Sequence, residues 1–136
     1  MTFCVVIDTN VLVSALLSSH EDSATVQVMN RIFAGDIIPV FSKDILAEYG
    51  EVLCRKKFHF SEETVCTLLN TITSIGELVV PSPSGEILPD KKDLPFYEVV
   101  LEKKEDNAYL ITGNKKHFPV KSFIVTAREF LTVLDS

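Results

Sequence analysis

The chain has 136 residues, the usual length of one domain, and 46% of them are apolar, which excludes a disordered tail. Its formal charge of −6 argues against binding nucleic acid through overall charge, but permits binding phosphates through metal ions. No apolar run could cross a bilayer, and no basic segment precedes the first one, so we expect neither a membrane span nor a signal peptide. The three cysteines lack metal-type spacing, which indicates a reduced, cytoplasmic protein.

A continuous apolar run over residues 3–7 ends abruptly at Asp8. Because apolar and polar residues do not alternate, the run predicts a strand covered on both faces, as in a parallel sheet. Thr9 or Asn10 is expected to cap a helix over residues 11–17. Asp8 would then stand at the carboxyl end of a buried strand, where open α/β sheets place their ligands.

The next segment predicts a helix followed by a short strand. Asp22 or Ser23 begins the helix, and Gly35 ends it as the residue after the C-cap. The strand covers residues 37–41, and Pro39 should disturb its pairing because proline has no backbone N–H.

Two further helices follow. Ser42 caps the first, whose apolar stripe runs over residues 45–53. Glu48 lies at the border of this stripe, so its side chain can reach the rim of the core. Ser61 begins the second helix, and Gly76 ends it.

The second half of the chain continues the alternation of strands and helices. Residues 81–93 form the only long irregular stretch, a length that is often functional. A helix starts near residues 94–95, and Thr126 begins a capping box for a closing helix. The remaining strands are expected at residues 78–80, 109–112 and 123–125. The pattern predicts a single α/β domain over residues 1–136, with a mostly parallel sheet and helices on both faces.

Four polar side chains mark the ends or borders of these elements: Asp8, Glu48, Asp93 and Asn114. If the first and fourth strands are neighbours, Asp8 and Asn114 face the same topological switch point. Carboxylates that converge raise one another's pKa, and a divalent cation removes that cost. Taken singly, each residue also has a structural interpretation: helix caps for the two aspartates, a solvated glutamate and a turn asparagine.

The order of these motifs resembles the PIN-domain family over nearly the whole chain. The matching segments are residues 5–16, residues 42–53, residues 90–98 and residues 109–118. The likeness is greatest to PIN proteins regarded as the toxins of bacterial and archaeal type II toxin–antitoxin pairs. It implies a three-layer α/β/α sandwich with strand order 3-2-1-4-5.

The resemblance also implies an endoribonuclease that hydrolyses RNA phosphodiester bonds with Mg²⁺ or Mn²⁺. Carried over by position, Asp8, Glu48 and Asp93 match the metal-binding, catalytic acids. Asn114 stands where many members have a fourth catalytic aspartate, so affinity for a second cation should fall. Thr9 and Asn10 match residues that support the first aspartate.

Other residues are expected to play lesser parts. Ser14, one turn further along the first helix, is expected to support Asp8 as well. Two basic clusters could guide an RNA backbone, and a solvated charged face is the alternative for each. They are Arg55, Lys56 and Lys57, and Lys115, Lys116 and His117. The second follows the fourth motif, so it should lie nearer the crevice.

The resemblance implies an antitoxin partner, and a homodimer that exposed Phe58, Phe60 and Tyr97 could serve. An alternative is a catalytically weak or inactive PIN-like module that binds an antitoxin or RNA, because Asn114 carries no charge. A phosphoacceptor domain of the receiver type does not fit the lone acid on the first strand. A nucleotide-binding module would need a glycine-rich phosphate loop, which the sequence lacks.

Overall fold

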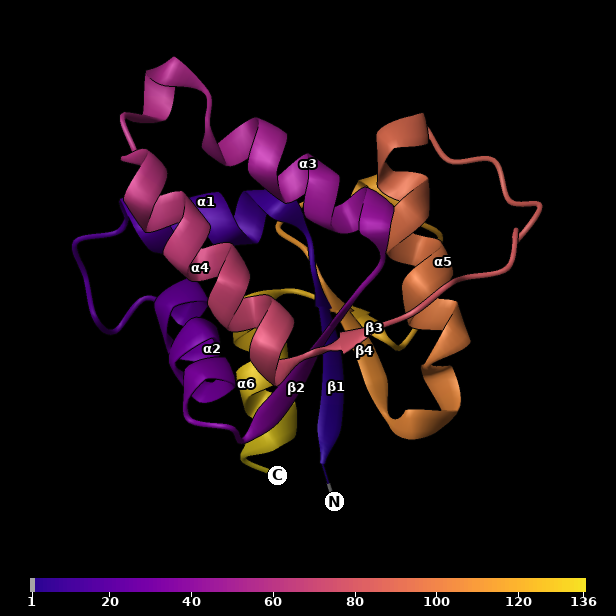
Figure 1. Ribbon diagram of the computed structural model, residues 1–136. Coiled ribbons are helices and arrows are strands. Elements are labelled where there is room, and N and C mark those ends of the chain that lie inside the picture. The colour runs from indigo at the N-terminus through magenta and orange to yellow at the C-terminus, as the bar shows by residue number, and fades with distance from the viewer. Residues whose placement is uncertain (1) are drawn as a thin grey trace.

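The computed structural model describes residues 2–136, which fold into a five-stranded parallel sheet flanked by helices (Figure 1). The strands are β1 (Phe3–Ile7), β2 (Ile37–Phe41), β3 (Glu77–Leu78), β4 (Ala108–Ile111) and β5 (Ile124–Val125). The helices are α1 (Thr9–Leu17), α2 (Ala24–Phe33), α3 (Lys43–Leu53), α4 (Glu62–Ile75), α5 (Leu94–Glu102) and α6 (Ala127–Leu134). The strand order β3-β2-β1-β4-β5 confirms the predicted fold class.

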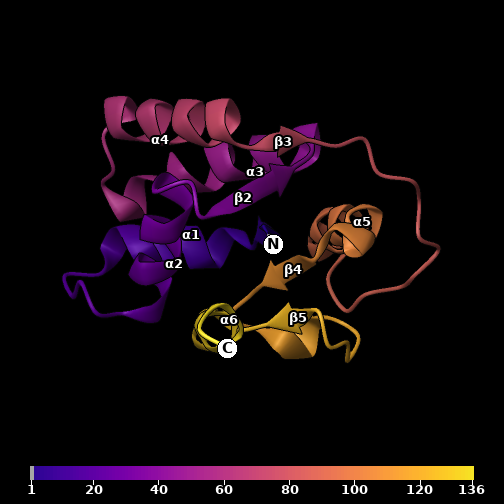
Figure 2. The same cartoon turned by 90° about the horizontal axis from the view of Figure 1, so that it is seen from below.

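The sheet is covered on both faces, as the apolar run at the N-terminus predicted. Helix α5 packs on one face against β1, β2 and β4, while α2, α4 and α6 cover the other (Figure 2). Strand β1 lies between β2 and β4, and its Val5 and Val6 are fully buried. Because β1 and β4 are neighbours, their carboxyl ends lie side by side at one edge of the sheet.

Strand β3 (Glu77–Leu78) is shorter than the strand predicted at residues 78–80 and begins one residue earlier. It pairs with β2 from Val40 onward, just after Pro39, whose ring removes a ladder donor. Gly76 brings the chain close to β2, since a Cβ there would lie 2.4 Å from the Pro39 carbonyl oxygen. Val79 N–H donates one more hydrogen bond to the Phe41 carbonyl oxygen, at 2.8 Å. After this bond the chain leaves the sheet and enters the long irregular segment.

Most predicted helix starts are confirmed. Four residues that were predicted to begin helices cap them with their side chains: Ser23, Ser42, Ser61 and Thr126. Gly35, with φ at +85°, ends the second helix as predicted. Helix α1 instead begins at Thr9, so Thr9 and Asn10 lie in its first turn and the prediction that one of them caps it is wrong.

The irregular segment before α5 is tied to that helix by carboxylates. Glu102 accepts the backbone N–H of Ser82 at 3.0 Å, and Glu98 accepts that of Ser84 at 2.7 Å. Tyr97, expected at an exposed dimer surface, is only 2% exposed, so that expectation is wrong. Its position on α5 turns it into the core.

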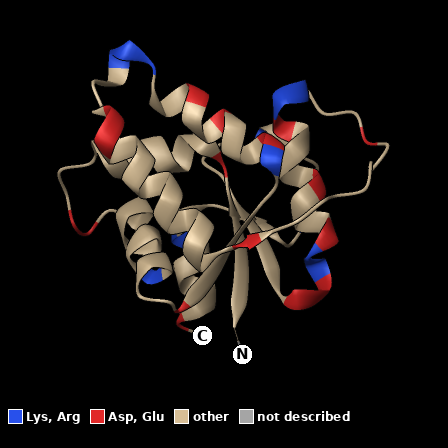
Figure 3. Cartoon of the chain, viewed as in Figure 1, with Lys and Arg blue, Asp and Glu red and all other residues tan. Residues whose placement is uncertain are grey.

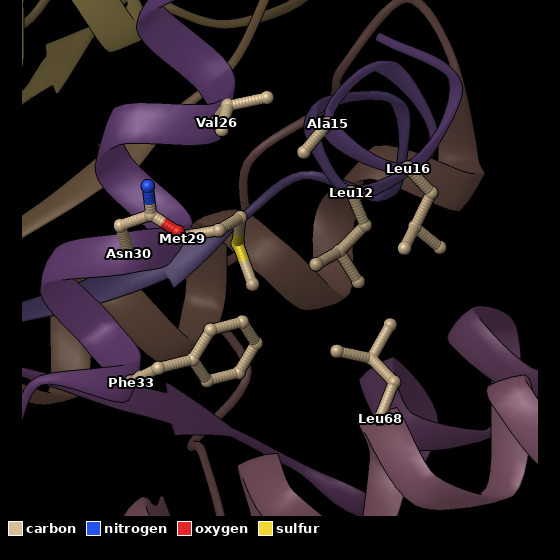
Figure 4. A pocket seen from close by; sticks show the side chains of 8 residues that line it. All are labelled: Leu12, Ala15, Leu16, Val26, Met29, Asn30, Phe33 and Leu68. Atoms are coloured by element: carbon tan, nitrogen blue, oxygen red, sulfur yellow. The ribbon is translucent and has the colours of Figure 1, made fainter. Parts of the chain in front are cut away.

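An apolar hollow lies between α1, α2 and α4, away from the carboxyl ends of the strands. Its walls include Leu12, Leu16, Met29, Phe33 and Leu68, which Figure 4 shows pointing toward one another. No ionisable side chain lines it. None of the helices in residues 2–136 combines the length and apolar character needed to span a bilayer.

Candidate active site

The three predicted acids line a single pocket at the carboxyl end of β1, where the start of α1, the middle of α3 and the start of α5 converge (Figure 1). Its polar walls comprise Asp8, Thr9, Asn10, Glu48, Glu51, Arg55, Asp90, Lys92 and Asp93. Acidic and basic segments therefore alternate at this edge of the sheet, as Figure 3 shows for α3 and for the turn before α5.

Asp8 holds the N-cap position of α1, yet its side chain makes no capping hydrogen bond. It instead accepts a 2.7 Å hydrogen bond from the hydroxyl of Thr112, which directly follows β4 and is fully buried. With the residue only 6% exposed, burial raises the pKa of the Asp8 carboxyl, and the Thr112 bond opposes that rise. The Asp8 carboxyl is thus oriented from the neighbouring strand.

Glu48 reaches the same pocket from α3. It accepts a 2.5 Å hydrogen bond from the Thr9 hydroxyl, so the residue after Asp8 fixes the glutamate rather than the aspartate. The next residue, Tyr49, is buried and donates its hydroxyl proton to the Ile7 carbonyl oxygen. These two bonds hold α3 against the end of β1.

Asp93 lies at the start of α5, at the end of a 3₁₀ turn (Lys91–Asp93) that runs directly into the helix. Asp90 caps this turn by accepting the Lys92 N–H at 2.9 Å, whereas Asp93 makes no capping bond and its Oδ2 lies 3.1 Å from Nδ1 of His117. Burial and the nearby charges of Asp8 and Asp90 raise the pKa of the Asp93 carboxyl to about 6, against the lowering effect of His117. The influence of Asp8 on Asp93 shows that the two carboxylates share one electrostatic environment.

Asn114 connects the two aspartates through the segment after β4. Its backbone N–H donates to the Thr112 hydroxyl at 3.0 Å, and its Nδ2 lies 3.0 Å from Nε2 of His117. A continuous path of hydrogen bonds therefore runs from Asp8 through Thr112, Asn114 and His117 to Asp93.

Two expected supports of Asp8 lie elsewhere. Asn10 lines the pocket but is exposed, and none of its side-chain atoms hydrogen bonds within residues 2–136. Ser14 is exposed on the side of α1 that faces α2, with its hydroxyl 3.4 Å from that of Thr25. Ser14 is six positions after Asp8, which at 3.6 residues per turn places the two on different sides of the helix, and its hydroxyl contact is with Thr25 rather than with Asp8.

The two basic clusters are each partly paired and partly exposed. Arg55 lines the pocket and forms an ion pair with Glu51 at 2.9 Å. Lys115 is paired with Glu129 at 3.1 Å, and His117 faces Asp93. Lys56, Lys57 and Lys116 are exposed, and the Lys57 ammonium lies 5.1 Å from the ring centroid of Phe58.

Comparison with known proteins places the fold and this pocket in context. A family profile described as the PIN domain matches residues 4–116, which is most of the chain and includes every residue of the pocket. The chain belongs to the PIN-domain family. It is also 32% identical over 114 residues to an uncharacterized protein, MJ1680, of Methanocaldococcus jannaschii; the match spans 82% of this chain and 70% of that protein.

PIN domains are in general nucleases, and they typically use divalent metal ions. The donor chemistry of this PIN domain fits such an ion. Asp8 and Asp93 both have raised pKa values, so each carboxylate favours a positive partner. The side-chain hydrogen bonds to the two aspartates both end on Oδ2, from Thr112 and from His117. The backbone N–H groups of Thr9 and Asn10 also favour the ionised Asp8 carboxyl and lower its pKa.

The three predicted metal ligands are not arranged as a closed cluster. Within residues 2–136, no group of three or more histidine, cysteine, aspartate or glutamate side chains lies close enough to hold an ion. Glu48 is engaged by Thr9, whereas the side-chain hydrogen bonds of Asp8 and Asp93 end on Oδ2 alone. Mg²⁺ is commonly held by one or two carboxylates and several waters, so these two carboxylates suffice for a site of this kind.

The sequence analysis assigned no role to three polar residues at or beside this pocket of the PIN domain. Thr112 is the hydrogen-bond partner of Asp8, and Glu51 and Lys92 line the pocket. A signal for Thr112 existed, because it is the first polar residue after the buried strand β4 and β4 was expected beside β1. Lys92 lies in the turn before α5, whose path over the pocket depends on tertiary packing.

Proposed function

We propose that this PIN domain is an endoribonuclease that hydrolyses RNA phosphodiester bonds with Mg²⁺ or Mn²⁺ held by Asp8 and Asp93. One observation carries the proposal. Two carboxylates from separate elements, Asp8 and Asp93, line one pocket, and Oδ2 of each is bound by a side chain from the segment after β4. Carboxylates brought together in this way repel each other, and a cation offsets that cost.

The residues of the pocket have separate roles in this proposal. Thr112 orients Asp8, while Glu48, held by Thr9, contributes a negative charge and accepts hydrogen bonds from metal-bound water. When bound, the ion lowers the pKa of water and stabilises negative charge on the phosphodiester. Arg55 and Lys92, which both line the pocket, are the cations proposed to contact phosphate oxygens.

We further propose that the chain is the toxin of a type II toxin–antitoxin pair, acting inside the cell with an antitoxin protein as its partner. The family resemblance supports this role, as does the apolar hollow between α1, α2 and α4, where Phe33 is 47% exposed. Growth arrest on expression, relieved by the product of a small adjacent reading frame, would support it. Expression without any effect on growth or RNA would contradict it.

The nuclease proposal is tested by incubating structured and unstructured RNAs with the purified chain, with Mg²⁺, with Mn²⁺ and with chelator. We expect cleavage only with metal, and Asp8→Asn should reduce its rate on the order of 100-fold or more. The reason is that metal charge supplies several kcal/mol of transition-state stabilisation, and each ~1.4 kcal/mol is a factor of about ten. Asp8→Asn keeps the side-chain shape and an acceptor for Thr112. Full cleavage by this variant would refute the proposal.

A non-catalytic module remains the second candidate because Asn114 is neutral where many relatives are expected to carry a fourth acid. In that case the pocket would not bind metal at millimolar concentration. Titration of the chain with Mn²⁺ by calorimetry separates the two candidates. Heat of binding that disappears in Asp8→Asn supports the nuclease, and no heat in the unmodified chain supports the module.

A further inference from the structure

His117 lies between two polar side chains of the pocket. Its Nδ1 is 3.1 Å from Asp93 Oδ2, and its Nε2 is 3.0 Å from Asn114 Nδ2. The imidazole is 42% exposed and Asp93 is 14% exposed, so the contact is formed at the edge of the protein interior. Both ring nitrogens already have protein partners, which leaves neither free to bind an RNA phosphate.

Two contacts hold the imidazole ring of His117. Its Nδ1 faces Oδ2 of Asp93, and its Nε2 faces the side-chain amide of Asn114, a group that can supply either an N–H or an oxygen to the ring. The ring is therefore fixed against Asp93 from two sides.

We propose that His117 is a positioning residue for Asp93; for the effect on metal, this rests on the proposed nuclease function. The contact from Nδ1 holds Oδ2 of Asp93, so Oδ1 keeps one orientation toward the pocket. Thr112 does the same for Asp8 from the same segment after β4. Asn114 supports the arrangement by holding the opposite edge of the imidazole ring.

The positioning role is tested by Mn²⁺ affinity in the absence of RNA. His117→Ala removes the donor to Asp93 and should weaken Mn²⁺ binding about 10- to 100-fold, the usual effect of losing a group that orients a metal ligand. His117→Asn should restore most of the affinity, because its amide nitrogen occupies nearly the place of Nδ1. His20→Ala, at an exposed histidine in the loop before α2, is the matched control and should leave affinity unchanged.

RNA cleavage by the same variants separates the possible results. A positioning role predicts that His117→Ala lowers kcat with little change in KM for RNA. Unchanged Mn²⁺ affinity with a raised KM and a weaker dependence on salt would instead identify His117 as a phosphate contact, and would overturn the role. Absence of Mn²⁺ binding and of cleavage in the unmodified chain would refute the nuclease function itself, whatever contact His117 makes.

Discussion

The N-termini of the helices in this PIN domain fall into two groups. Helices α2, α3, α4 and α6 begin with a serine or threonine whose hydroxyl accepts a backbone N–H of the first turn. Helix α1 begins with Asp8, and α5 begins with Asp93 after a 3₁₀ turn that Asp90 caps; the side chains of Asp8 and Asp93 themselves make no capping bond of this kind. Their carboxylates are bound by Thr112 and His117 instead.

This difference separates stability from chemistry. The four hydroxyl caps satisfy helix N–H groups, and each contributes about 1 kcal/mol to folding. The two aspartates are instead partly or fully buried and have raised pKa values. A folded chain keeps such unfavourable charges where they have a function. The contrast therefore distinguishes the pocket from the rest of the fold without reference to any relative.

Removing the hydroxyl that binds Asp8 should have the largest effect among the variants that leave both aspartates in place. Thr112→Val keeps the shape of a fully buried side chain but leaves the Asp8 oxygen and the Asn114 N–H without their partner. We expect metal affinity and cleavage to fall about 10- to 100-fold, and the free energy of unfolding to fall by about 1–3 kcal/mol. Calorimetric Mn²⁺ titration and denaturant unfolding measure the two effects.

Thr126→Val is the matched control for Thr112→Val, since it removes a threonine hydroxyl from the capping box of α6. It should lower stability by about 1 kcal/mol and leave Mn²⁺ affinity as it was. Equal metal affinity in the two variants would show that the Asp8–Thr112 bond is structural only.

The ionised Asp93 carboxylate should destabilise the folded chain, and replacing Asp93 should therefore change how the free energy of unfolding depends on pH. The Asp93 pKa of about 6 lies above its ordinary value of 3.8, so the folded state holds the proton more tightly than the unfolded state. Without metal, stability should therefore fall as pH rises from about 4 to about 6, and stay reduced above that. Asp93→Asn should raise the free energy of unfolding by about 1–2 kcal/mol at pH 7 and by little at pH 4.

Denaturant unfolding in chelator at both pH values checks this, with Asp22→Asn at an exposed carboxylate as the control. Millimolar Mn²⁺ should abolish the advantage, because the ion stabilises the ionised pair in the unmodified chain. A variant that is less stable than the unmodified chain at pH 7 would mean that Asp93 is a favourable structural ion.

Much of this arrangement could be predicted from the sequence because it depends on local signals. The buried run ending at Asp8 and the hydroxyl caps at Ser23, Ser42 and Ser61 are written in neighbouring residues, and the structure confirms the strand and the caps. Their alternation with apolar stripes was enough to predict a parallel sheet, and the family resemblance supplied its strand order.

The remainder depended on contacts between distant segments. The capping rule favoured Thr9 or Asn10, but Thr9 bonds to Glu48, 39 residues away, and the helix begins earlier. His117 was grouped with two lysines because it follows them, whereas packing of the segment after β4 against α5 directs it to Asp93. In each case the side chain forms a hydrogen bond with a residue from a distant segment, instead of the local contact that the neighbouring sequence suggested.

The smallest expected effect comes from a cap outside the pocket. Ser61→Ala removes the hydroxyl that accepts the Thr64 N–H at 3.1 Å, at an exposed position at the start of α4. It should lower the free energy of unfolding by about 1 kcal/mol at pH 4 and pH 7 alike, because no titrating group is involved. Mn²⁺ affinity and RNA cleavage should be unchanged. If the loss of this cap changed metal binding as much as the loss of the Thr112 hydroxyl, the helix N-termini would form a single coupled framework, and the two groups of helices would not be functionally distinct.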